Sequence, residues 1–324
     1  MTFIAGVRVL LRTDTPPNRQ SDHGVPVKAS NGVVVSLAGA AALAVVSLAS
    51  LGAGATPSRL PGLDPQSSAL DDARWAFYSA RYDSAAALAH DQCMADTSNL
   101  AACELRTAAL LLQIRRAMGD SPDTGASLRQ CITCPPLLAA FDATLAHATA
   151  AARTRLRAVP VDDETLFLLG KLDLNYVWLQ LGTLGHKTGW AEYWEARRSL
   201  DTVLTRQPGH VRARVARGWI DYIVDTKMRR GTRWVLGGGS KTRGLAAIRS
   251  AAATDADFFT RAEAVFALWD MQVRERDFGA AFATARLLLI DFPANQDLKR
   301  FVDQRRPAPP VTGTPASVVK DDAQ

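Results

Sequence analysis

Apolar residues recur every three to four positions along most of the chain, and this spacing predicts α-helices. Breakers such as Gly119, Pro160 and Pro208 separate the periodic segments. Sustained alternation of apolar and polar residues, the mark of a half-buried strand, is absent from the sequence. The chain is therefore predicted to be all-α, with helices over residues 71–80, 84–95, 99–118, 136–158, 163–181, 190–206, 210–226, 240–253, 257–274 and 278–290, and a short closing piece over 294–304.

One segment near the N-terminus has no polar face. Residues 33–55 form an uncharged apolar run of 23 residues, and a helix of that length, about 34 Å, is long enough to cross a bilayer. Basic residues outnumber acidic ones in residues 1–32, which predicts that this flank stays in the cytoplasm and that the chain after residue 55 is exported. Two alternatives stay open: an uncleaved inner-membrane anchor, or a signal-peptide h-region cut after residues 53–55, which leaves a periplasmic protein.

Composition shifts mark the two ends of the exported part. Residues 56–70 contain three prolines and are predicted to be a linker, and residues 306–324 contain four and are predicted to be a disordered tail. Residues 71–305 are then one helical domain. The formal charge is +6 for the chain and +4 after residue 55, an excess too small to indicate nucleic acid or another polyanion as a partner.

The last predicted helix carries a recognisable pattern. The turn at residues 277–281 is followed by small or apolar residues at fixed offsets and then by a proline, and this order resembles the second helix of a tetratricopeptide repeat. The positions that carry the resemblance here are Ala281, Ala285, Leu288 and Pro293; two further segments share it through Tyr82, Ala85 and Ala89, and through Ala196, Leu200, Val203 and Pro208. The resemblance implies a right-handed superhelix of divergent helix pairs over residues 71–305, with an inner groove that binds protein segments.

A second resemblance is more particular. Residues 218–222, 234–239 and 241–245 look like a subgroup of bacterial tetratricopeptide proteins that carry a G-x-x-x-Y helix, an L-G-G loop and a K-G-L helix. That subgroup has no assigned chemistry, so it implies a fold and a cell-envelope setting, and no substrate.

Aromatic residues gather in one part of the sequence. Eight of them fall between residues 176 and 234: Tyr176, Trp178, Trp190, Tyr193, Trp194, Trp219, Tyr222 and Trp234. Helical repeat proteins anchor extended peptides on aromatic and arginine-rich faces, so these residues are candidates for partner binding. The alternative is that they fill the core between helices rich in alanine.

A glycine-rich loop at residues 237–239 is flanked by cations, namely Arg229, Arg230, Arg233 and Lys241. The Walker spacing fails, because Val235 and Ser240 occupy its two glycine positions, so nucleotide hydrolysis is not indicated. One interpretation is a binding site for an anionic group of a partner or lipid; the other is a tight turn with solvated basic residues.

The four cysteines suggest oxidation rather than metal binding. Cys93 and Cys103 flank a predicted helix turn and can face each other, which leaves Cys131 for Cys134; the other two pairings stay open. The histidines lack the spacing of a metal site, no catalytic motif is visible, and no cofactor is indicated.

These observations predict a non-enzymatic protein–protein interaction scaffold or adaptor in the bacterial cell envelope. The alternative function is a helical subunit of an envelope transport or polysaccharide-export system that contacts a small ligand or glycan. An open inner groove favours the scaffold, and a closed cavity favours the ligand-binding subunit.

Overall fold

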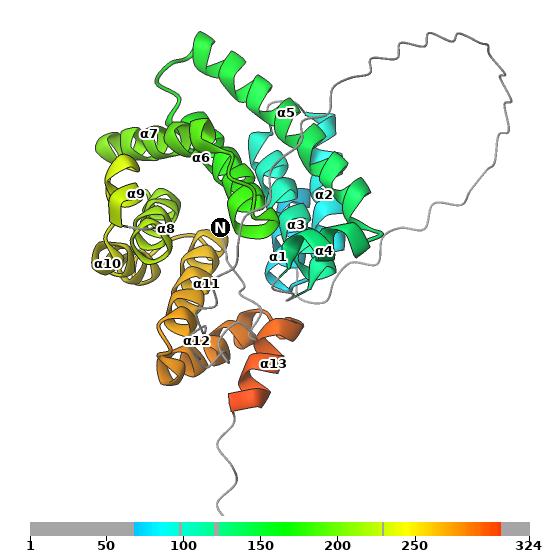
Figure 1. The fold of residues 1–324 in the computed structure, drawn as a ribbon, viewed down its shortest axis with the longest axis vertical. Coiled ribbons are helices and arrows are strands. Elements are labelled where there is room, and N and C mark those ends of the chain that lie inside the picture. Colours follow the sequence, from blue (N-terminus) through cyan, green and yellow to red (C-terminus); the bar gives the residue numbers. More distant parts are fainter. Residues whose placement is uncertain (1–67, 97–98, 120–122, 229, 306–324) are drawn as a thin grey trace, which may run out of the picture. The chain divides into compact units, whose positions relative to one another are not determined.

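The computed structural model describes residues 68–96, 99–119, 123–228 and 230–305. The predicted all-α class is confirmed for these residues, which form α-helices, one π-helical segment and no strand. In chain order the elements are α1 (Ala69–Tyr78), α2 (Tyr82–Ala95), α3 (Leu100–Met118), α4 (Thr124–Gln130), α5 (Cys134–Ala158), α6 (Asp163–Val177), η2 (Trp178–Leu184), α7 (Trp190–Arg206), α8 (Val211–Lys227), α9 (Arg230–Val235), α10 (Lys241–Ala252), α11 (Phe258–Arg274), α12 (Phe278–Asp291) and α13 (Gln296–Arg305). Figure 1 shows their arrangement.

Polar caps fix where most of these helices begin. The side chain of Asn99 accepts a hydrogen bond from the backbone N–H of Ala102 at the start of α3, and Asp162 accepts one from Thr165 at the start of α6. Each bond satisfies an N–H group that the helix itself leaves unpaired. Because such caps are visible in the sequence, the predicted helices begin within two residues of the observed ones.

Three elements differ from the prediction. Helices α4 and α9 lie in segments predicted as loops, because six or seven residues are too few to show an apolar period. The helix predicted over residues 163–181 stays α-helical only to Val177 and continues as the π-helix η2, which ends at Gly185 in the left-handed region. The predicted linker is also shorter than expected, since α1 already begins at Ala69.

Helices that are neighbours in the sequence are neighbours in space. Helix α2 lies between α1 and α3, and the later pairs are α3 with α5, α6 with α7, α8 with α10 and α11 with α12, after which α13 covers α12. Two of these pairs approach closely at glycine. A Cβ atom on Gly244 of α10 would lie 2.5 Å from the carbonyl oxygen of Gly218 of α8, so the two backbones touch.

The first helix of the array lies against the last ones. The ring of Trp75 in α1 stacks on Phe258 with centroids 5.9 Å apart and lies 5.1 Å from the ring of Phe292, which follows α12. The buried side chain of Asn295 donates a hydrogen bond of 2.7 Å to the backbone carbonyl of Tyr78. The helices of residues 68–305 therefore close on themselves, and the inner face is not the open groove that the sequence analysis expected.

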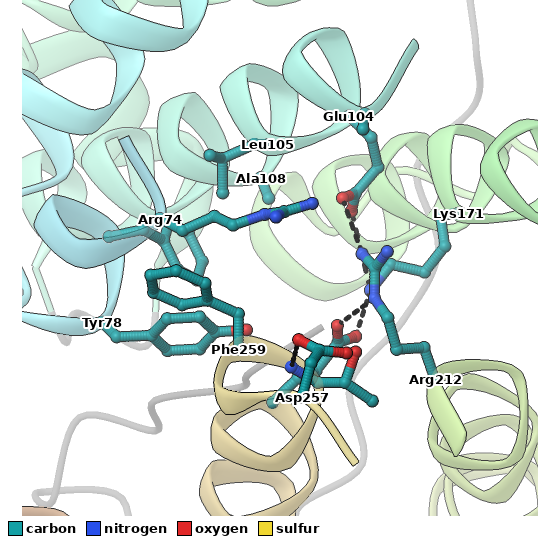
Figure 2. Close-up of a pocket in the computed structure, with 13 residues that line it drawn as sticks. Arg74, Tyr78, Glu104, Leu105, Ala108, Lys171, Arg212, Asp257 and Phe259 are labelled. Atoms are coloured by element: carbon teal, nitrogen blue, oxygen red, sulfur yellow. Dashed lines mark hydrogen bonds and ion pairs between the residues drawn. The ribbon is translucent and has the colours of Figure 1, made fainter. Parts of the chain in front are cut away.

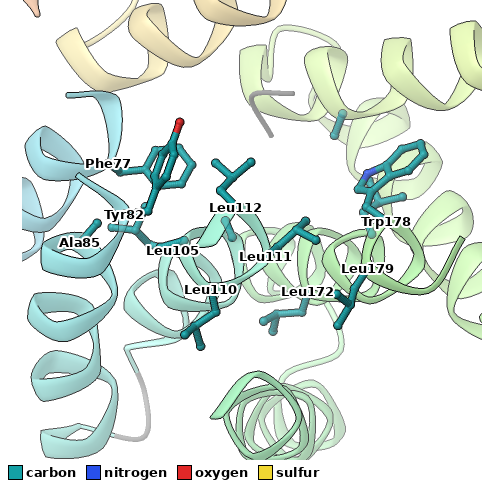
Figure 3. Close-up of a cluster of buried hydrophobic side chains, with 14 of the residues drawn as sticks. Phe77, Tyr82, Ala85, Leu105, Leu110, Leu111, Leu112, Leu172, Trp178 and Leu179 are labelled. Carbon is teal, nitrogen blue, oxygen red and sulfur yellow. The ribbon is translucent and has the colours of Figure 1, made fainter. Parts of the chain in front are cut away.

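The core is continuous from α1 to α6. Figure 3 shows Phe77 and Tyr82 next to Leu105 of α3, and Leu111 of the same helix facing Leu172 and the neighbouring residues of α6. These side chains are buried, and burial of each large apolar side chain contributes about 1.5–3 kcal/mol. This core holds α3 and α6 in fixed positions, and both helices supply charged residues to the interior.

Three sequence predictions lie outside the described residues: the apolar segment 33–55 with its flank 1–32, most of the linker 56–70, and the tail 306–324. Among the helices that the structure does describe, none has the length and apolar character of a membrane span.

Candidate functional site

A cluster of four charges lies where α3, α6, α8 and α11 meet; Glu104, Lys171 and Glu263 are buried, and Arg212 is half-buried. Lys171 Nζ lies 2.5 Å from an oxygen of Glu263 and 3.6 Å from one of Glu104. Arg212 Nε donates to the other Glu263 oxygen at 2.7 Å, and its Nη2 lies 3.5 Å from Glu104. Each carboxylate thus faces both cations, and the four helices are tied together at their centre.

The pKa shifts of Lys171 and Glu263 favour the charged form of both groups. Burial by itself would lower the pKa of Lys171, but Glu104 and Glu263 raise it above its ordinary value. Burial would likewise raise the pKa of Glu263, but Lys171 and Arg212 hold it well below the usual range. Charges in a dry interior persist only when they are paired in this way.

A cavity of about 200 Å³ adjoins the cluster. Figure 2 shows the rings of Tyr78 and Phe259 on one side of it, the side chain of Arg74 reaching across it, and Arg212 on the opposite side. Glu104, Lys171 and Glu263 belong to the same lining, so the ion cluster forms part of the cavity wall. The cavity suits a small molecule rather than an extended peptide.

A second feature is an exposed edge of α7 and α9, here called the tryptophan edge and made of Trp190, Trp194, Trp234 and Val235. Trp234 is 84% exposed, Val235 62% and Trp190 39%, whereas Trp194 is half-buried. Trp190 and Trp194 share one face of α7 because they are four residues apart. The carbonyl of Trp234 accepts a hydrogen bond from Gly237, whose backbone lies against the ring of Trp194.

Arg197 fixes the loop that carries this edge. Its guanidinium donates to the backbone carbonyls of Leu236, Gly237 and Gly238 at 2.8, 2.8 and 3.1 Å. Gly237 and Gly238 both have φ near +73°, a conformation in which a side chain is strained. The glycine loop is therefore a tight turn that Arg197 ties to α7.

At the glycine loop, the two cations that the structure describes in full are paired with carboxylates, which favours the turn interpretation over the anion site. Arg233 Nη1 pairs with Asp225 at 2.5 Å, and Lys241 Nζ pairs with Glu275 at 2.5 Å. The second oxygen of Asp225 accepts a hydrogen bond from the backbone N–H of Lys241. Carboxylates of the chain itself thus neutralise this region. Arg229 lies outside the described residues, and of Arg230 the structure describes the backbone of α9 but no side chain.

The eight aromatic residues predicted as candidates for partner binding differ in how far they are buried. Trp178, Tyr193, Trp219 and Tyr222 are buried in the core, so their assignment to a partner-binding face is wrong for this structure. Tyr176 is half-buried, and its ring lies under Gly189. Burial of large rings is favourable, and the core interpretation holds for the four buried residues of the eight. Trp190, Trp194 and Trp234 are the members that reach the surface.

The cysteines pair as the sequence analysis favoured. The sulfur atoms of Cys93 and Cys103 lie 2.12 Å apart and link α2 to α3, and those of Cys131 and Cys134 lie 2.03 Å apart at the start of α5. Within the described part of the chain no group of His, Cys, Asp and Glu side chains has the arrangement of a metal site.

The sequence matches no known family model and no curated protein. The site therefore has to be judged on its own geometry. Sequence reasoning missed the ion cluster, because Glu104, Lys171, Arg212 and Glu263 are isolated charges spread over 160 residues. The one signal was their position on the apolar faces of helices, where a charge is out of place.

Proposed function

We propose that this protein is a non-enzymatic scaffold or adaptor of the bacterial cell envelope that holds a protein partner on its tryptophan edge. The observation that carries the proposal is the exposure of Trp234 near the end of α9, next to a loop that Arg197 holds through three hydrogen bonds. Tryptophan is among the residues that contribute most to protein interfaces, and a rigid loop loses little entropy when it binds. The occupant is a protein segment that supplies an apolar side chain to the exposed ring of Trp234 and the neighbouring Val235.

The fold assignment within this proposal is a right-handed superhelix of tetratricopeptide-like pairs. Its support is the close approach of paired helices at small residues. A Cβ on Gly170 would meet the Ser199 side chain at 3.2 Å and the Ala196 carbonyl at 3.3 Å, and Gly218 meets α10 in a similar way. Small residues at these places let each pair of helices lie side by side.

The cellular address is also part of the proposal. Two disulfides are the expected state of four cysteines in an oxidising compartment, which agrees with export behind residues 33–55. If that segment is not cleaved, it holds the helical domain at the inner membrane; if it is cleaved, the domain is periplasmic.

A photo-cross-linking residue in place of Val235, in the full chain in living cells, tests this function. We expect one protein partner to be cross-linked from this position. Trp234→Ala should abolish the capture of that partner without a change in melting temperature, because the side chain is exposed. The matched control is Ile132→Ala, which removes an equally exposed apolar side chain from another part of the chain. Capture that is unchanged by Trp234→Ala contradicts the proposal.

The alternative, a ligand-binding subunit of an envelope transport or polysaccharide-export system, is favoured by one observation. Helix α1 closes the inner face against α11 and α12, and a cavity remains where a groove was expected. The cavity does not replace the tryptophan edge, since the two features lie on different helices, but it calls for an explanation of its own.

A further inference from the structure

The central cavity has one apolar wall and one polar wall. Phe77, Ala101, Leu105, Ala108 and Phe259 form the apolar wall. Arg74, Tyr78, Thr260 and the ion cluster form the other, and Figure 2 shows Arg74 and Arg212 reaching in from opposite sides. A molecule that fits both walls has a small apolar body and a polar end.

The acceptors of the polar wall are already engaged. The carboxylates of Glu104 and Glu263 face Lys171 and Arg212. Asp257 accepts a hydrogen bond of 3.0 Å from the backbone N–H of Thr260 and caps α11. These oxygens therefore have little capacity left for a hydrogen-bond donor from outside.

The hydrogen-bond donors of the polar wall, in contrast, are only partly engaged. Each guanidinium carries five N–H donors; Arg74 places one on Asp71, and Arg212 directs Nε and Nη2 to the two glutamates. Tyr78 is only 7% exposed and also lines the cavity, with its ring beside that of Phe259 (Figure 2). Its hydroxyl can donate one further hydrogen bond to a molecule in the cavity.

We infer that the cavity binds a small organic monocarboxylate, whose two oxygens accept from Arg74, Arg212 and the Tyr78 hydroxyl while its apolar body lies against Phe259 and Leu105. A donor-rich wall selects an acceptor, and guanidinium groups bind carboxylates in a bidentate geometry. A dianion is disfavoured, because Glu104 and Glu263 lie in the same wall and repel a second negative charge. This site is independent of the tryptophan edge and of the partner proposed for it.

Isosteric probes separate carboxylate recognition from simple filling of the cavity. The full chain is titrated calorimetrically with benzoate, benzamide and benzylamine, which share a ring and differ in the charge of the substituent, and with hexanoate and hexanamide, which replace the ring by an alkyl chain. Inorganic phosphate is the sixth probe. We expect at least one carboxylate to bind at least tenfold more tightly than its amide, and no heat from benzylamine or phosphate.

Tyr78→Phe locates the binding. It removes only the hydroxyl and keeps the ring that stacks on Phe259, so the fold is preserved, and benzoate or hexanoate affinity should fall about tenfold with the loss of one charge-assisted hydrogen bond. Arg74→Gln should lower it by a similar factor. The matched control is Tyr82→Phe, which changes a buried tyrosine that does not line the cavity and should leave affinity unchanged. Equal binding of carboxylates and amides, tighter binding of phosphate, or affinity that Tyr78→Phe leaves unchanged overturns the inference.

Discussion

Asp173 is buried in α6 with an exposed fraction of 1%, and its Oδ2 has no hydrogen-bond partner within the part of the chain that the structure describes. Burial, reinforced by the negative charge of Glu195, raises its pKa to about 8. Between the ordinary pKa of an aspartate and this value, the folded state holds a proton that the unfolded state has released. Stability due to this group therefore falls as the pH rises from about 4 to 8.

Asp173→Asn removes this penalty because the amide is neutral at every pH. The variant should be more stable than the wild type at pH 8, by an amount on the order of a few kcal/mol, and equally stable near pH 4. Urea unfolding at the two pH values measures the difference, and Asp303→Asn, on the exposed face of α13, is the control. A variant that is no more stable than the wild type at pH 8 contradicts the assignment of a buried, protonated carboxyl group.

At the scale of single residues, the sequence did not show which aromatic residues are exposed or which charged residues form the ion cluster. The sequence does not distinguish an aromatic residue that fills the core, such as Trp219, from one that lies on the surface, such as Trp234. A charge on an apolar helix face, such as Lys171, shows its meaning only when its partners from other helices are known. The cysteines were the exception. Cys93 and Cys103 are ten residues apart, on either side of the turn between two helices, so the sequence leaves few ways for them to pair.

At the scale of helices, the predicted bounds agree with the structure where an apolar period and a polar cap occur together. Helices α7 and α11 extend over residues 190–206 and 258–274, beside predicted ranges of 190–206 and 257–274. The prediction failed at α9, whose six residues show no apolar period and are held by contacts such as the ion pair of Arg233 with Asp225 of α8. Local signals are enough to predict a long helix, but whether a short helix forms depends on tertiary contacts.

The approach of α8 to α10 gives a prediction at this scale. Gly244→Ala would place a methyl group 2.5 Å from the Gly218 carbonyl and 3.0 Å from the Tyr222 nitrogen, both backbone atoms that cannot turn away. The two helices must then separate, and the fold should lose about 1–3 kcal/mol. Thermal or urea unfolding measures the loss.

Gly279→Ala is the matched control for that change. A methyl group on Gly279 meets nothing within 4 Å, and alanine is the better helix former by up to about 1 kcal/mol. The control should therefore be neutral or stabilising. Equal effects of the two substitutions would show that α8 and α10 are not in backbone contact.

At the scale of the helical domain, closure is the property that governs the rest. It encloses the ion cluster and leaves a cavity instead of a groove, which is why we propose the tryptophan edge rather than an inner groove as the binding surface for a partner. Tandem helix pairs follow from sequence patterns, but the meeting of the first helix with the last depends on aromatic contacts such as Trp75 with Phe292. No local pattern reports a contact between residues 217 positions apart, and this is why closure was not predicted.

Closure also places α3 beside α13, where Arg116 Nη2 lies 2.9 Å from Asp297 and the pair is partly exposed to solvent. Carbodiimide cross-linking of the Arg116→Lys variant, followed by peptide mass spectrometry, tests this contact directly, because the reagent joins only amines and carboxylates that touch. The native pair Lys241 and Glu275 is the internal control, since it links neighbouring helices in any arrangement of the array. The account predicts a cross-link between positions 116 and 297 in the monomer, in a yield comparable to that of the control. A control cross-link without one between positions 116 and 297 would mean that the array is open, and would contradict the closed interior.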